Sequence, residues 1–279
     1  KIFQISCVLK RDGESREPKF ILTLGDPDQR RTGDDVMILR FDSEADLLEG
    51  YADFLREYRP NIVTGYNILG FDIEYMIERA KENFVYDTFS KASFLKYTGG
   101  KERSIKWFSQ AYGDQRFTFL DLEGILHVDL LPLVRRDYKF PNYRLKTVSE
   151  FFIGETKDPL NAKGIFKCYR LGMQGCKPGA TPEDIEKGRK ALAVCAKYCV
   201  QDSALVLKMF DVLQTWVGLT EMAKVCNVRM FDLYTKGQQI KVYSQVYKKC
   251  MFEDRVVERD GYVPSPDERY TGAHVFQPK

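Results

Sequence analysis

The first third of the chain alternates between short apolar runs and a stretch with helical spacing. Apolar runs at residues 2–9, 20–24 and 36–41 are separated by polar segments with Gly and Pro, and they predict three strands of an antiparallel meander. Ser43 then predicts the start of a helix, because apolar residues keep a spacing of about 3.6 from there to Pro60. A further strand follows this helix, so we expect a mixed α/β arrangement in which a later strand lies parallel to an earlier one.

The middle of the chain combines an irregular segment with short elements. Residues 84–116 have no clear period but interleave basic and aromatic side chains, a composition that suits either a solvated loop or contact with single-stranded nucleic acid. Residues 116–120 and 124–128 predict a hairpin. Helices are expected next, at 129–136 and 145–152.

A long helical pattern dominates the last third of the chain. Thr181 followed by Pro182 is typical of a helix start, and the apolar spacing then continues to Trp216. Because this is long for one helix of a globular protein, we expect a break near Gly188 or just before Lys197.

A later helical pattern has an apolar stripe and a basic face. Ile240, Tyr243 and Tyr247 are predicted to pack against a core. The opposite face, with Lys241 and Lys248, points either to water or to phosphate groups, and the pattern leaves both possibilities open.

The composition of the 279 residues is that of an ordinary globular protein, with 44% hydrophobic and 30% charged residues. The net charge is only +3, so any basic surface must be local, and no apolar run reaches the length of a membrane span. Seven cysteines without a Cys-x-x-Cys pair favour reduced thiols inside a cell, with Cys195 and Cys199 in the core. Two histidines exclude chemistry built on several imidazoles, which makes carboxylates the candidate reactive groups.

The stretch at residues 60–75 predicts a strand, a turn and a helix, with Asp72 where the helix begins. Two interpretations of Asp72 stay open, since an aspartate at this position can cap the helix or serve as a reactive carboxylate. On the later helical pattern, Tyr198 and Asp202 stand four residues apart and therefore share a face. Asp202 lies among apolar neighbours, so a solvent-facing position and an inward one are both possible.

This pair of segments has the residue types that two-metal phosphodiester hydrolysis needs. Divalent ions about 3.5 to 4 Å apart hold the attacking and leaving oxygens and take carboxylate ligands. A tyrosine hydroxyl can orient the attacking water. The spacing alone is only moderately specific, because short patterns centred on aspartate are frequent.

Several ordered stretches resemble the exonuclease region of the family B DNA polymerases. Residues 60–72, Pro-Asn-Ile-Val-Thr-Gly-Tyr-Asn-x-x-x-Phe-Asp, closely resemble the second exonuclease motif, and residues 198–202 resemble the third. Residues 129–155 are similar to the connecting segment, and residues 235–242 and 270–273 resemble the stretch that leads to the palm. The most similar groups are the eukaryotic delta-type catalytic subunits and the polymerases of large DNA viruses.

The resemblance implies a ribonuclease H-like 3′ to 5′ exonuclease domain with a mixed sheet, which removes misincorporated nucleotides from a primer end. Asp72 and Asp202 would be metal-binding carboxylates for Mg²⁺ or Mn²⁺, and Tyr198 would position the water. Asn67 and Phe71 would contact the frayed single strand.

The resemblance also implies partners and a place of action. Tyr270, Gly272 and Ala273 would lie near the duplex and influence how the primer divides between editing and synthesis. The partners would be a DNA primer-template with its single-stranded 3′ end, the remainder of the polymerase and a sliding clamp, in the nucleus or at a viral replication site.

Two parts of the family pattern are expected outside the chain. The first exonuclease motif, Asp-x-Glu, would precede Ile2, and the palm motifs would follow Lys279. Residues 72–74 and 121–123 have the same letters but do not fit the order of the motifs. The resemblance therefore implies a segment of a longer polymerase that by itself binds metal weakly or not at all and is inactive alone.

We predict that residues 1–216 form the exonuclease domain and that residues 217–279 begin an incomplete helical connection to the palm. Two alternatives stay open. One is a non-catalytic module that binds single-stranded nucleic acid and has the same fold. The other is a structural fragment whose activity requires the rest of the polypeptide or a partner subunit.

Overall fold

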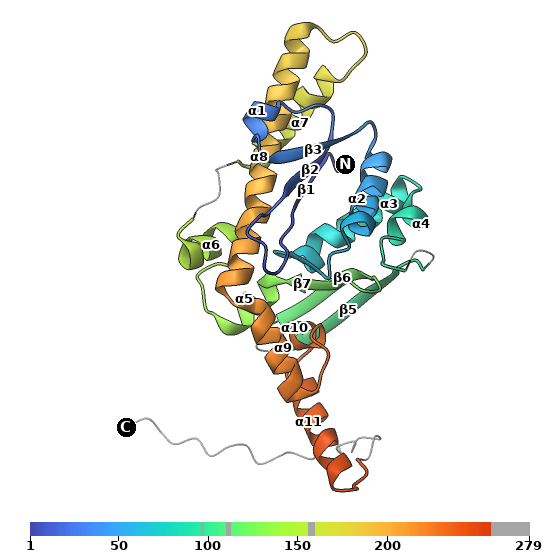
Figure 1. Cartoon of the computed structure of the whole chain (residues 1–279), viewed down its shortest axis with the longest axis vertical. Coiled ribbons are helices and arrows are strands. Elements are labelled where there is room, and N and C mark those ends of the chain that lie inside the picture. Colours follow the sequence, from blue (N-terminus) through green and yellow to red (C-terminus); the bar gives the residue numbers. More distant parts are fainter. Residues whose placement is uncertain (96–97, 110–112, 156–159, 258–279) are drawn as a thin grey trace, which may run out of the picture.

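A computed structural model describes residues 1–95, 98–109, 113–155 and 160–257, and its chain has the expected mixed α/β architecture (Figure 1). The strands are β1 (Gln4–Val8), β2 (Lys19–Leu24), β3 (Val36–Phe41), β4 (Ile62–Gly65), β5 (Lys101–Ser109), β6 (Gly113–Asp121) and β7 (Leu126–Asp129). The helices are α1 (Gln29–Thr32), α2 (Glu44–Tyr58), the π-helical turn η1 (Ile68–Asp72), α3 (Ile73–Glu82), α4 (Tyr86–Ser90), α5 (Leu130–Asp137), α6 (Leu145–Ile153), α7 (Ala162–Gly175), α8 (Pro182–Val212), α9 (Thr215–Cys226), α10 (Asp232–Thr235) and α11 (Gln239–Phe252).

The first three strands form one mixed sheet in the order β1-β2-β3. Strand β1 pairs antiparallel with β2, but β2 pairs parallel with β3, so the predicted antiparallel meander is wrong for the third strand. The segment between β2 and β3 contains helix α1, which lets the chain return to the same end of the sheet before β3 begins.

Of two further strand pairs, one is a local hairpin and the other brings distant parts of the chain together. Strands β5 and β6 form an antiparallel hairpin, so the segment predicted as irregular contains a strand. Strand β7 pairs parallel with β4, and the predicted hairpin at 116–120 and 124–128 is therefore wrong. Gly124 does form a turn, with φ at 84°, but this turn directs β7 away from β6 and onto β4.

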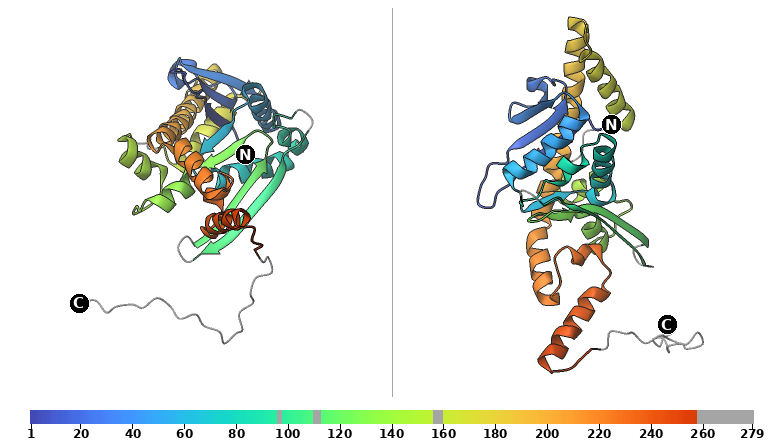
Figure 2. Two further views of the ribbon diagram at one scale, coloured as in Figure 1. Left: turned by 60° about the horizontal axis from the view of Figure 1, so that its bottom comes forward. Right: turned by 90° about the vertical axis from the view of Figure 1, so that its right-hand side faces the viewer.

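Helix α8 runs without interruption, so the predicted break near Gly188 or Lys197 is wrong. The predicted start is confirmed, because the Thr181 hydroxyl accepts a hydrogen bond from the Asp184 N–H at 3.1 Å. At Gly188 the missing side chain serves packing: a Cβ there would lie 2.9 Å from the Leu171 carbonyl oxygen of α7. Helix α7 and the first half of α8 form a hairpin that projects from the body (Figure 2, right).

The largest hydrophobic cluster joins α2, α3, β6 and β7 and extends past the predicted domain boundary at residue 216. Leu219, Leu233 and Tyr234 lie in it and are almost fully buried. Helix α2 begins as predicted at Ser43, which forms a reciprocal capping box with Asp46. The boundary at residue 216 stays a prediction.

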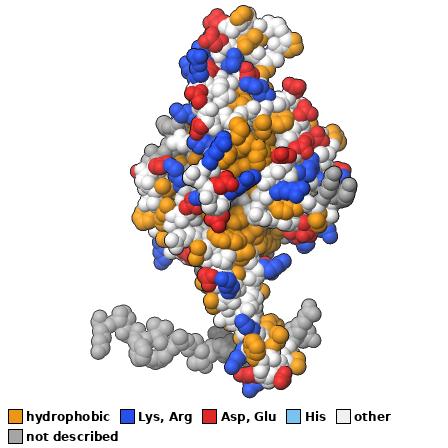
Figure 3. Space-filling view, viewed as in Figure 1, with side chains coloured by type: hydrophobic (Ala, Val, Ile, Leu, Met, Phe, Trp, Pro, Cys, Tyr) orange, Lys and Arg blue, Asp and Glu red, His pale blue; other side chains and the backbone are white. Residues whose placement is uncertain are grey.

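The face of the molecule seen in Figure 3 carries both signs of charge interspersed with apolar side chains. Helix α11 buries none of its residues, with Tyr243 and Tyr247 exposed, so the predicted packing of its apolar stripe against a core is wrong in the described part of the chain. No helix among the described residues combines the length and the apolar composition that crossing a bilayer requires.

Candidate functional site

The predicted central strand and its partner end at the same edge. In the parallel pair of β4 and β7, Gly65 lies opposite Asp129. Both strands therefore deliver their carboxyl ends, and the residues that follow, to one place. The Asn67–Asp72 turn begins two residues after Gly65, and helix α5 begins directly after Asp129.

The Asn67–Asp72 turn, which comprises Asn67 and η1, has an unusual backbone. Asn67 adopts the left-handed conformation with φ at 66°, and the next five residues form a π-helical turn. Asparagine tolerates the left-handed region better than most residues. At Gly70 an added Cβ would lie only 2.5 Å from the Asn67 side-chain oxygen, so the glycine lets this side chain pack over the turn.

The turn presents its predicted functional side chains to solvent. Asn67 and Asp72 are exposed, and Phe71 keeps 60% of its surface exposed. The Phe71 ring stacks on Tyr75 one helical turn later, with ring centres 5.9 Å apart and an interplanar angle of 4°. Leu69 points the opposite way and is fully buried. An exposed aromatic ring with a fixed orientation is suited to stacking on a nucleobase.

Asp72 does not cap helix α3. Its backbone is already helical, with φ at −64° and ψ at −46°, and its described side chain makes no capping hydrogen bond. The capping interpretation of Asp72 is therefore wrong. Although the residue reaches the surface, the surrounding chain limits hydration of the carboxyl group and raises its pKa to about 6. Asp72 lies close enough to Asp129 and Tyr51 to influence the pKa of both side chains.

Asp129 ties the two chain segments together. Its Oδ1 accepts hydrogen bonds from the Asn67 N–H at 2.7 Å and the Leu131 N–H at 3.0 Å, and its Oδ2 accepts one from the Leu69 N–H at 3.0 Å. Burial raises the pKa of Asp129 to about 6, while the three N–H donors act in the opposite direction and the nearby Asp72 raises it further.

Tyr198 and Asp202 lie half-buried on helix α8, one turn apart, as the spacing predicts. One turn further, Val206 belongs to the same hydrophobic cluster as Tyr66, the residue before Asn67. On the neighbouring face of α8, the Ser6 hydroxyl of β1 lies 2.8 Å from the Cys199 carbonyl oxygen. The face of α8 that carries Asp202 is thus packed beside the start of the Asn67–Asp72 turn, and the direct pairing of Asp72 with Asp202 stays a prediction.

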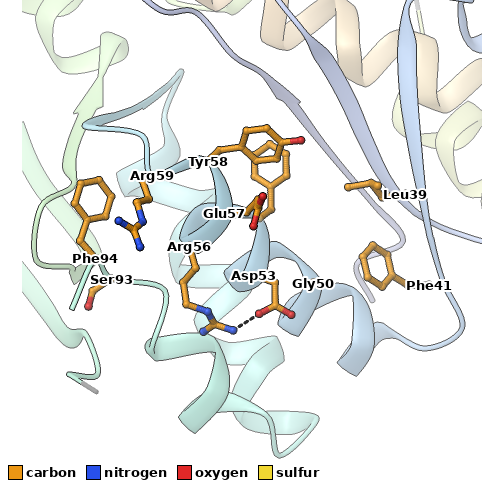
Figure 4. A pocket seen from close by; sticks show the side chains of 11 residues that line it. Leu39, Phe41, Gly50, Asp53, Arg56, Glu57, Tyr58, Arg59, Ser93 and Phe94 are labelled. Carbon is orange, nitrogen blue, oxygen red and sulfur yellow. Dashed lines mark hydrogen bonds and ion pairs between the residues drawn. The ribbon is translucent and has the colours of Figure 1, made fainter. Parts of the chain in front are cut away.

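Tyr270, Gly272 and Ala273 fall outside the described residues. A pocket of about 660 Å³ lies along α2 and is lined by Phe41, Arg56 and Phe94 among others (Figure 4). Its lining, which consists of described residues, includes none of the predicted site residues.

The candidate metal ligands of this chain, the carboxylates of Asp72 and Asp202, provide only part of a site for a divalent cation. Asp72 supplies an exposed carboxylate that the fold does not use for capping, and Asp202 supplies a second on α8. Within the ranges that the structure describes, no group of three or more His, Cys, Asp or Glu side chains is placed to hold a metal ion. The described chain thus offers oxygen ligands suited to Mg²⁺ or Mn²⁺ but not a complete set.

Asp129 is the site residue that the sequence analysis did not identify. The signal was present: an aspartate directly after a short apolar run and before Leu130 and Leu131 is typical of a strand end that begins a helix. What the pattern did not predict is that β7 pairs with β4. That pairing places the Asp129 side chain beneath the Asn67–Asp72 turn.

Comparison with known proteins gives consistent similarities. The family model for the DNA polymerase family B exonuclease domain matches residues 1–148. The chain is 48% identical to DNA polymerase 120R of Invertebrate iridescent virus 3, over all of this chain and 24% of that protein. It is 31% identical to the DNA polymerase delta catalytic subunit of Candida albicans, over all of this chain and 25% of that protein. The chain spans about a quarter of the length of these curated relatives.

Proposed function

Because this chain belongs to the exonuclease domain of the family B DNA polymerases, we propose that it removes nucleotides from the 3′ end of a DNA primer as part of a longer replicative polymerase. The reaction is hydrolysis of the terminal phosphodiester bond by water. We also propose that the domain has the ribonuclease H-like arrangement typical of such enzymes. The chain spans about a quarter of the length of its relatives, and the proposed activity would use groups outside it.

One observation carries most of this proposal: the Asn67–Asp72 turn uses its buried side chain for folding and leaves its polar and aromatic side chains exposed. Leu69 is buried, whereas Asn67, Phe71 and Asp72 face solvent. Exposed side chains on a rigid, irregular turn are typical of a binding site rather than of core packing. Phe71 would stack on a base of the frayed strand, and the Asn67 amide would hydrogen-bond to it.

The carboxylates would hold divalent metal ions together with ligands from the remainder of the polymerase. Asp72 and Asp202 are the ligands from this chain, and Mg²⁺ or Mn²⁺ suits their hard oxygen atoms. When bound, such ions stabilise negative charge on the attacking and leaving oxygens. The Tyr198 hydroxyl, one helical turn from Asp202, would orient the attacking water.

The partners follow from the same proposal. The chain would act on a DNA primer-template whose 3′ end is single-stranded, next to the synthesis site of the same polymerase. A sliding clamp is the expected processivity partner, and the nucleus or a viral replication site is the expected place of action. Tyr270, Gly272 and Ala273 would lie near the duplex and influence the transfer of the primer between the two sites.

The test is excision of a mispaired primer by the whole polymerase with Asp72→Ala or Asp202→Ala. Each variant should lose excision and retain nucleotide addition, because the substitutions remove ligands of the proofreading site only. Undiminished excision in either variant would reject the assignment. Asp28→Ala, which removes an aspartate from the N-terminus of helix α1, is the matched control and should excise normally.

The same assay separates this proposal from a non-catalytic module that binds single-stranded nucleic acid. Such a module would bind a frayed primer through the same exposed side chains. The unsubstituted polymerase would then show no excision that depends on Asp72 and Asp202. A structural fragment would neither bind the frayed primer through these side chains nor contribute Asp72 and Asp202 to excision.

A further inference from the structure

Asp129 makes more hydrogen bonds than the helix it begins requires. An aspartate at a helix N-terminus typically accepts hydrogen bonds from the first N–H groups of its own helix. Asp129 accepts one of this kind, from Leu131. The other two come from Asn67 and Leu69, which precede it in the chain by 62 and 60 residues. Most of its bonding capacity therefore serves the Asn67–Asp72 turn.

The residue type matches this double task. Oδ1 accepts from Asn67 and Leu131, and Oδ2 accepts from Leu69. A carboxylate has two acceptor oxygens, whereas serine, threonine and asparagine each have one side-chain oxygen. Any of those residues would suffice to start α5, but only a carboxylate of this length satisfies the helix and the turn together.

The turn needs an acceptor from elsewhere in the chain. The first N–H groups of a helical segment have no partner within that segment. Asp129 is 1% exposed and Leu69 is fully buried, so water does not replace the carboxylate easily. Without it, the left-handed start of the turn at Asn67 would be held less firmly.

We infer that Asp129 is a positioning residue for the excision reaction: it fixes the backbone of the turn that presents Asn67, Phe71 and Asp72. It acts through those residues and does not touch the DNA itself. The effect on excision rests on the proposed function. The effect on the turn does not, and it is measurable without any reaction.

The first arm of the test is amide hydrogen exchange of the full 279-residue chain, resolved at Asn67 and Leu69. Asp129→Ala should speed exchange at both amides at least about tenfold, because both lose their acceptor. Exchange in the part of α8 around Asp202 should not change. Equal exchange at Asn67 and Leu69 in Asp129→Ala and the unsubstituted chain would overturn the inference.

Asp129→Asn gives a residue-specific signature. With its oxygen in the place of Oδ1, the amide keeps the bonds from Asn67 and Leu131, but its NH₂ group then faces the Leu69 N–H. We therefore expect fast exchange at Leu69 and retained protection at Asn67. Loss of protection at both amides, or at neither, would contradict the proposed division of the bonds.

The second arm is excision by the whole polymerase, with kcat and KM measured separately on a frayed primer. Asp129→Ala should lower kcat/KM about tenfold or more, and Asp129→Asn should recover part of the loss. Two controls separate positioning from general destabilisation. Asp28→Ala removes an aspartate that caps another helix, α1. Leu47→Ala destabilises the fold through a hydrophobic cluster that does not contain the Asn67–Asp72 turn.

The two arms distinguish the possible failures. If Asp129→Ala excises as well as Leu47→Ala does at equal stability, the positioning role is wrong. If Asp72→Ala also excises normally, the proposed function is wrong, and the exchange arm alone then decides whether Asp129 holds the turn.

Discussion

The two halves of the candidate site obtain their geometry in different ways. Tyr198 and Asp202 share a face of α8 because the helix is regular, so their relation is local and set by the helical repeat. The Asn67–Asp72 turn is irregular, and a carboxylate some sixty residues away holds two of its N–H groups. One half is encoded within five residues, and the other requires the tertiary fold.

This difference has a consequence for robustness. A helix of this length tolerates many substitutions without changing the relative positions of Tyr198 and Asp202. The turn depends on a few buried groups, so single substitutions there should alter its geometry.

The largest effect should come from removing the proposed metal ligands from both halves at once. Asp72→Ala and Asp202→Ala should each lower excision by about 10³-fold or more, and the double variant should lose little beyond either single variant, because the two carboxylates act as a unit. Single-turnover excision assays measure this. Losses that multiply in the double variant would show that the turn and α8 act independently.

The next effect concerns how the free energy of unfolding depends on pH through His127, a residue of β7. His127 of β7 is buried, which lowers its pKa to about 4. The unfolded chain binds a proton at this side chain near pH 6.5, so the contribution of His127 to the free energy of unfolding falls by about 3 kcal/mol as the pH falls from about 6.5 to about 4.

Replacing His127 by Leu should therefore remove this loss, so the free energy of unfolding of the variant should rise relative to that of the unsubstituted protein by about 3 kcal/mol between about pH 6.5 and pH 4. Urea unfolding of both proteins between pH 7 and pH 4 measures the difference, and Asp72 and Asp129 contribute equally to both. A difference in the free energy of unfolding between the two proteins that stays constant over this pH range would contradict the assignment.

A smaller effect is expected at Tyr198. Tyr198→Phe keeps the ring on α8 and removes the hydroxyl that would orient water, so kcat for excision should fall about 10- to 100-fold with little change in KM. A rise in KM with unchanged kcat would instead assign Tyr198 to DNA binding.

The smallest effect is expected at Gly70. In Gly70→Ala the new Cβ would approach the Asn67 side-chain oxygen to 2.5 Å, so the amide must move. We expect KM for a single-stranded 3′ end to rise about three- to tenfold. Gly218→Ala in α9, where an added Cβ meets nothing within 4 Å, is the control and should leave KM unchanged. An equal KM in the two variants would contradict the proposal that Asn67 contacts the single-stranded 3′ end.

The contrast also explains which features the sequence predicted. Local signals were sufficient for the starts of α2 at Ser43 and α8 at Thr181, and for the shared face of Tyr198 and Asp202. These depend on capping and periodicity, which act over a few residues.

Features that depend on strand pairing were not predicted. The parallel pairing of β2 with β3 and of β7 with β4 requires knowledge of where the chain returns, which turn residues such as Gly124 do not provide. The role of Asp129 was missed for the same reason. The uninterrupted course of α8 was missed because the break was inferred from the length of the helical pattern, whereas α7 packs closely against the continuous helix at Gly188.

The proposed excision reaction depends most on Asp72 and Asp202 serving one site. The direct measurement is a crystal structure of the whole polymerase with Mn²⁺ and a single-stranded 3′ end, in which anomalous scattering locates the metal. We predict bound Mn²⁺ within about 2 to 2.5 Å of carboxylate oxygens of both Asp72 and Asp202, beside the terminal phosphate. Mn²⁺ bound at the terminal phosphate with either carboxylate outside this distance would contradict the account.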